Sequence, residues 1–96
     1  MERGARTSLW QAAALGLVDR VQQQLAETSP GREELDNALW CAAHGGQRAT
    51  AELLLARGAD PAWLGHDGLT AATAAERAGA HELATWLREQ AGADAP

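Results

Sequence analysis

The chain has 96 residues, a length that fits one small domain with a single, thin core. Thirteen acidic against eight basic residues give a formal net charge of −5, which argues against the basic surface that a nucleic-acid-binding protein needs. No apolar run approaches the ~20 residues of a membrane-spanning helix, and the single cysteine allows no internal disulfide. We therefore expect a cytoplasmic protein that binds neither nucleic acid nor membrane.

The apolar residues, 46% of the chain, are mostly alanine and leucine, and four tryptophans supply all the aromatic area. Alanine and leucine are strong helix formers, so the composition predicts an all-α fold. Few bulky side chains are present, so the core must be closed by alanine-rich helices that approach one another closely. All eight basic residues are arginine, which together with the abundant alanine is typical of a GC-rich bacterial genome.

Three stretches of the chain repeat one pattern, with starting points 30 and then 33 residues apart. Each begins with a residue whose side chain can cap the first turn of a helix. These residues are Thr7, Asn37 and Thr70. A short apolar helix follows and ends at a glycine, which can take the positive φ of a tight turn. These glycines are Gly16, Gly46 and Gly79.

The apolar positions of each copy fall at helical spacing on both sides of the glycine. Leucine and paired alanines form the first helix, and a stripe of larger side chains forms one face of the second. The first-helix positions are Leu9, Ala12, Ala13, Leu39, Ala42 and Ala43. The second-helix positions are Val18, Val21, Leu25, Leu53, Leu54, Leu55, Leu83, Trp86 and Leu87. After the second copy, Gly58 suits the position past a helix end and Pro61 prevents the helix from continuing.

The pattern resembles the ankyrin repeat, with its T-P-L-H-x-A-A start, glycine turn, V-x-x-L-L helix and G-A-D end. The match is best in "LLLARGADPAWLGHDGLTAATAAERAG" and extends over about residues 5 to 94. The resemblance implies one domain, residues 1–96, in which three helix-turn-helix repeats stack and hairpin-like loops project. The repeats would span about residues 5–35, 36–66 and 67–96. The link "ETSPGREELD" lacks G-A-D, so we expect an irregular first loop.

Trp10 and Trp40 occupy the histidine position of the family's T-P-L-H start. In the family, that histidine ties neighbouring repeats together by hydrogen bonds. An indole has one donor and no acceptor, so we expect it to contribute packing area in place of this network. The shared register predicts that the two rings touch or nearly touch between repeats. The alternative is an exposed aromatic floor for a ligand.

Cys41 and His44 are neighbours on one helix face, because they are three residues apart. A Cys–His nucleophile needs a third group to orient the imidazole, and no carboxylate is suitably placed nearby in the sequence. We therefore interpret the pair as a small apolar residue beside a surface histidine. His44, His66 and Asp67 are suitable metal ligands but follow no metal-binding spacing, so we predict neither a metal nor another cofactor.

The resemblance places the recognition surface at the loop tips and just before the glycine turns. The predicted partner-binding residues are Glu33, Asp36, His44, Trp63, Leu64, His66, Asp67, Leu69 and Arg77. Glu34 belongs beside them, with Arg6, Ala14 and Leu15 at the other end. Trp63 and Arg77 are of the residue types that dominate interfaces, so we expect them to carry most of the affinity. The alternative for the charged members is an ordinary solvated face.

These observations predict a non-enzymatic scaffold, a monomer or weak homo-oligomer, that binds another protein through its concave face and loop tips. The competing hypothesis is a small-ligand-binding or catalytic accessory protein, with Trp10 and Trp40 as the floor and Cys41 and His44 as polar groups. We expect the concavity of three repeats to be too shallow for ligand pockets, which measure about 300–1,000 Å³.

Overall fold

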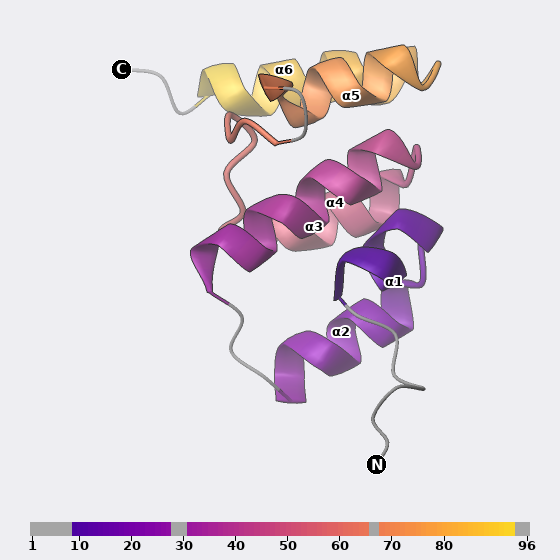
Figure 1. Ribbon diagram of the computed structural model, residues 1–96, viewed down its shortest axis with the longest axis vertical. Helices are drawn as coiled ribbons and strands as arrows, with labels where there is room; N and C mark the ends of the chain where they lie inside the picture. Colours follow the sequence, from indigo (N-terminus) through magenta and orange to yellow (C-terminus); the bar gives the residue numbers. More distant parts are fainter. Residues whose placement is uncertain (1–8, 28–30, 66–67, 94–96) are drawn as a thin grey trace.

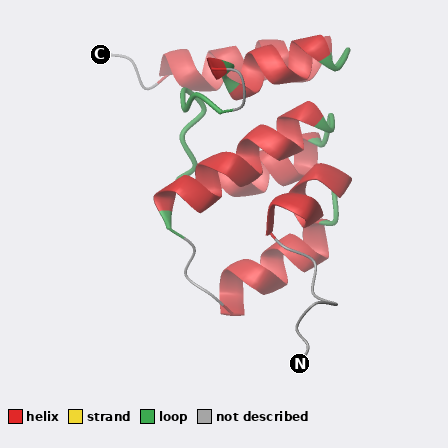
Figure 2. Cartoon of the chain, viewed as in Figure 1, coloured by secondary structure: helices red, strands yellow, loops and turns green. Residues whose placement is uncertain are grey.

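The computed structural model describes residues 9–27, 31–65 and 68–93, and this part of the chain folds into helices joined by turns and loops (Figure 2). The helices are α1 (Leu9–Leu15), α2 (Val18–Glu27), α3 (Arg32–His44), α4 (Arg48–Ala56), α5 (Ala71–Arg77) and α6 (His81–Ala93). Within these described ranges, no helix is both long and apolar enough to cross a bilayer.

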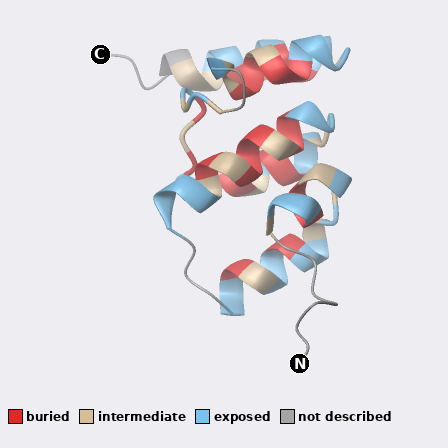
Figure 3. Cartoon of the chain, in the orientation of Figure 1, coloured by how far each residue is buried: buried red, intermediate tan, exposed pale blue. Residues whose placement is uncertain are grey.

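The six helices form three helix-turn-helix pairs that are stacked along the longest axis of the molecule (Figure 1). The first helices of the pairs make the main contacts between repeats, because α3 packs against α1 on one side and α5 on the other. The predicted all-α stack of three repeats is confirmed. The central position of α3 also explains why buried residues concentrate on it (Figure 3).

The core is built from small side chains, as the composition predicts. Eleven of its seventeen clustered residues are alanines, and Ala12, Ala13, Ala42 and Ala43 are completely buried. Larger fully buried side chains such as Leu39, which each contribute about 1.5–3 kcal/mol, fill the space between the helices. Close approach of alanine faces is therefore what joins one repeat to the next.

The three turn glycines have the positive φ that their spacing predicts, with values of 74° at Gly16, 72° at Gly46 and 91° at Gly79. The residue after each glycine donates its backbone N–H to a carbonyl five positions back, as Leu17 does to Ala12 at 3.0 Å. This is the Schellman arrangement, which satisfies carbonyl groups at a helix end. Because the motif recurs in every copy, the three second helices leave their turns in the same way.

The predicted helix starts are confirmed in one copy and wrong in another. Thr70 caps α5, since its hydroxyl accepts a hydrogen bond from the backbone N–H of Thr73 at 3.3 Å. Asn37 caps nothing, because α3 already begins at Arg32. The Glu34 side chain accepts the N–H of Gly31 at 3.1 Å and so stabilises this earlier start. Thr7 lies outside the described residues.

Candidate partner-binding site

Trp40 connects the middle repeat to the loop that follows it. Its ring is 9% exposed, and its indole N–H donates a hydrogen bond to the carbonyl oxygen of Leu69 at 2.9 Å. The same oxygen accepts the backbone N–H of Gly65 at 2.8 Å. The expectation that an indole would offer only packing area was therefore incomplete, because a single donor is enough to hold this loop.

Trp10 has the same register in α1, yet 48% of it is exposed. The difference follows from the early start of α3. The repeat spacing makes Asp36 the counterpart of Leu69, but Asp36 lies within α3, whereas Leu69 lies in a loop. Among the described residues, no loop of this kind reaches Trp10, and its side chain is half exposed. The two tryptophans thus have different environments despite their common position.

Trp10 and Trp40 form walls of one recess between α1 and α3. Its volume is about 430 Å³, within the range of small-molecule pockets, so the expectation of a shallow surface was wrong. The lining residues are Trp10, Ala14, Asn37, Trp40, Cys41 and His44. The His44 ring is stacked on that of Trp40, with centroids 5.4 Å apart and planes 6° from parallel. The sequence predicts the grouping of Trp10, Trp40, Cys41 and His44 but not the cavity or the part that Asn37 takes in it.

Cys41 lies in the recess without the surroundings of a nucleophile. Its thiol donates to Oδ1 of Asn37 at 3.9 Å, a weak contact within α3. Burial raises the pKa of the Cys41 thiol, which lowers the fraction of reactive thiolate at neutral pH. The His44 ring is stacked on Trp40. This geometry favours the interpretation of Cys41 as a small apolar side chain.

Asp36 is not part of the exposed surface that the sequence predicts. It is 4% exposed, and its Oδ1 accepts the backbone N–H of Asp60 at 2.7 Å. The carboxylate therefore anchors the loop after α4 to α3, and this is a correction to its assignment as a partner-binding residue. Glu33 and Glu34 are exposed, but they lie in the first turn of α3 and not in a loop. Acidic side chains are favourable there.

The loop residues that were predicted to bind a partner differ in exposure. Leu64 is 61% exposed, whereas Trp63 and Leu69 are half-buried. Gly65 lies between the Trp40 and Trp63 rings, since a Cβ built on it would meet them at 2.6 and 2.9 Å. Both rings therefore lie close to this glycine. His66, Asp67 and Arg6 lie outside the described residues.

The ends of the first helices form a row along one edge of the stack. Ala14, His44 and Arg77 are equivalent positions at the ends of α1, α3 and α5. His44 and Arg77 are exposed, and so is Leu15 beside Ala14, at 65%. The row therefore continues from the recess toward the last repeat and offers a charged side chain at its far end.

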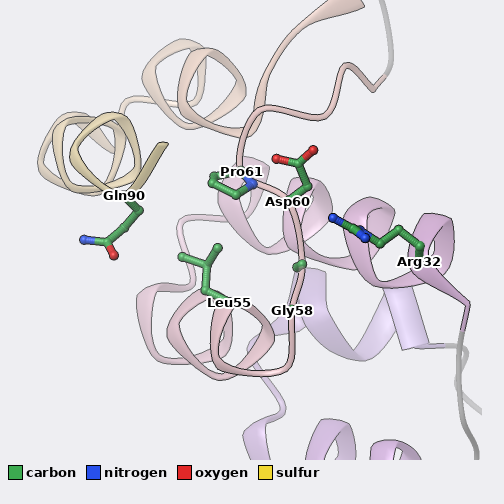
Figure 4. A pocket seen from close by; sticks show the side chains of 7 residues that line it. Arg32, Leu55, Gly58, Asp60, Pro61 and Gln90 are labelled. Atoms are coloured by element: carbon green, nitrogen blue, oxygen red, sulfur yellow. The ribbon is translucent and has the colours of Figure 1, made fainter. Parts of the chain in front are cut away.

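A second cavity, of about 330 Å³, lies between the loop after α4 and helix α6 (Figure 4). It is lined by Arg32, Leu55, Gly58, Ala59, Asp60, Pro61 and Gln90. The backbone N–H groups of Gly58, Ala59 and Asp60 all donate within the protein, so they are not available to a ligand. Over the part of the chain that the structure describes, no group of three or more His, Cys, Asp or Glu could hold a metal ion.

Comparison with known families agrees with this architecture. A model of ankyrin repeats in three copies matches residues 9–96. The chain belongs to the ankyrin repeat family. A search of curated proteins gave no significant match. Ankyrin repeats are generally protein–protein interaction modules and are typically non-catalytic.

Proposed function

We propose that this ankyrin repeat protein binds a partner protein through the face formed by α1, α3 and α5 and through the loop between α4 and α5. The observation that carries this proposal is the recess between α1 and α3, with the half-exposed Trp10 at its edge. An apolar hollow next to exposed polar side chains is the usual anatomy of an interface centre and its rim. The stacked helices fix these groups before binding, so little ordering entropy is lost.

The proposed surface extends from the recess along the edge of the stack. His44 and Arg77 are exposed at successive helix ends, and Leu64 adds an exposed apolar side chain on the loop. Arginine and tryptophan contribute most at interface centres, so Trp10 joins Trp63 and Arg77 as an expected source of affinity. The protein would act as a monomer or weak homo-oligomer in the cytoplasm.

The competing function is binding of a small ligand or catalysis on one. The volume of the recess supports a ligand, but the raised pKa of Cys41 opposes a nucleophilic role. Iodoacetamide labelling across a pH series tests this point. We expect labelling of Cys41 to rise only above about pH 8.5, the ordinary range of a thiol. A labelling midpoint near neutrality would favour the catalytic alternative.

The protein-binding proposal is tested by selecting partners from a displayed protein library and measuring the affinity of one purified partner by calorimetry. We expect Trp10→Ala and Arg77→Ala each to weaken binding by about tenfold or more. Leu17→Ala is the matched control, because Leu17 is 42% exposed and does not line the recess. Equal affinity of all three variants and the wild type would contradict this surface.

A further inference from the structure

The side chains that line the recess define the chemistry of what enters it. Two indoles, an imidazole, an amide, a thiol and a methyl group surround the space. None of these lining groups is a carboxylate, guanidinium or ammonium, so the lining offers an occupant no carboxylate–ammonium or carboxylate–guanidinium pair. Its contacts are mainly with aromatic rings.

The walls of the recess are planar. Trp40 already holds the flat His44 ring in a stacked arrangement, with planes 6° from parallel. Trp10 brings a second indole to the edge of the same space, and 48% of it is exposed. Aromatic rings in contact gain about 0.5–1.5 kcal/mol beyond the area that they bury. Planar walls of this kind favour a planar occupant over an aliphatic one.

Asn37 gives the recess a polar group next to these rings. It lies in the middle of α3 and is half-buried, and among the described residues its Oδ1 makes the long contact with the Cys41 thiol. An amide can accept a hydrogen bond from a phenol or an indole and can donate one to a phenol oxygen. The lining therefore suits a ring that carries one polar atom, as tyrosine and tryptophan side chains do.

The exposure of Trp10 indicates the source of this ring. A pocket for a free ligand usually buries 70–90% of the ligand surface. Here the lining residues come from only two helices, α1 and α3, and one wall residue, Trp10, remains half exposed. A side chain that projects from a partner is covered on its outer side by the rest of that partner. The open recess thus fits a partner's side chain better than a free molecule.

From these observations we infer that the recess between α1 and α3 receives one tyrosine or tryptophan side chain of the partner protein. The ring lies between Trp10 and the Trp40–His44 stack, and its polar atom faces Asn37. This inference rests on the proposed protein-binding function and adds the kind of residue that the partner must present.

The test is an NMR titration of the 96-residue chain with N-acetyl-tryptophanamide, and with N-acetyl-leucinamide for comparison. The four tryptophans give four indole N–H signals, each assigned with a Trp→Phe variant. We expect the aromatic probe to shift the signals of Trp10 and Trp40 and to leave Trp86 unchanged, because Trp86 is in α6 and does not line the recess. Trp10→Leu, which keeps an apolar group, should lower the affinity for the aromatic probe by about fivefold to tenfold.

Three results would overturn the inference. The first is that the indole signals of Trp10 and Trp40 do not shift. The second is that the leucine probe binds as tightly as the aromatic probe. The third is that Trp10→Leu binds the aromatic probe as tightly as the wild type and the Leu17→Ala control do. The partner-selection experiment separates this inference from the broader function. If selected partners bind tightly without an essential Tyr or Trp, the protein-binding function stands and the aromatic occupant is rejected. Probe binding without any selected partner would reject the protein-binding function and, with it, the partner side chain as occupant.

Discussion

The indole N–H of Trp40 donates to the carbonyl oxygen of Leu69 across 29 positions of the chain, at 2.9 Å. This bond holds the loop after α4 over the ring and makes Trp40 a buried residue. Within the described parts of the chain no such loop covers Trp10, which forms a wall of the recess. The covering loop is thus the structural difference between two tryptophans at equivalent positions.

Gly65→Ala should destabilise the protein. A Cβ at this position would lie 2.6 Å from the Trp40 ring and 2.9 Å from Trp63, so one ring or the loop must move. Overpacking of this kind costs about 1–3 kcal/mol. Thermal unfolding followed by circular dichroism checks this, with an expected loss of about 4–8 °C per kcal/mol for a domain of this size. Leu64→Ala is the control, because Leu64 is 61% exposed in the same loop and its change should alter stability by about 0.5 kcal/mol or less.

Asp36→Ala should also lower the free energy of unfolding, by about 1–3 kcal/mol. The substitution leaves the backbone N–H of Asp60 without the carboxylate oxygen that it now contacts at 2.7 Å. Urea unfolding measures the loss. Glu33→Ala, at an exposed position of the same helix, should change stability by about 0.5 kcal/mol or less. Equal effects of the two variants would show that Asp36 does not anchor the loop.

Thr50→Val should stabilise the protein. Thr50 is completely buried in α4, and its hydroxyl has no hydrogen-bond partner among the described residues. Valine has the same branched shape without the hydroxyl, so the change removes a desolvation cost of about 1 kcal/mol or more. We expect a higher midpoint in urea unfolding. Thr85→Val should give no such gain, because Thr85 is exposed and donates to the carbonyl of His81.

Arg88→Ala should raise the pKa of Glu76. A hydrogen bond from Arg88 and then its positive charge hold the pKa of this exposed carboxyl below its usual range. A group with a lowered pKa in the folded state contributes stability above its unfolded pKa, about 4.3, and loses it as the pH falls through the folded value. Carbon-13 NMR titration of the carboxyl checks the shift. Arg77→Ala, next to Glu76 in the chain, should leave the pKa of Glu76 nearly unchanged. An equal shift in both variants would show that Arg88 is not the cause of the lowered pKa.

The sequence is sufficient to predict the turns of this fold, because they depend on local rules. A glycine after a short apolar helix needs a positive φ and allows a Schellman bond, and neither property depends on distant residues. Gly16, Gly46 and Gly79 follow this rule, and the cap at Thr70 is equally local. The alanine faces were predictable for the same reason, since their spacing alone places them between helices.

The recess was not predictable in this way, because it depends on where α3 begins. The segment before Asn37 was read as a loop by analogy with the other copies, although Glu33 and Glu34 are typical of the first turn of a helix. That acidic pair was the available signal for the early start. The burial of Asp36 depends on Asp60, which is 24 positions away, and no local pattern reveals such a contact.

The placement of the four tryptophans allows unfolding to be followed by intrinsic fluorescence. Phe and Tyr are absent, so all the near-ultraviolet signal of the protein comes from four indoles. One lies in each repeat, Trp10 in α1, Trp40 in α3 and Trp86 in α6, and Trp63 lies in the loop between the second and third repeats. Emission from single-tryptophan variants would therefore report separately on the melting of each repeat, without any attached dye.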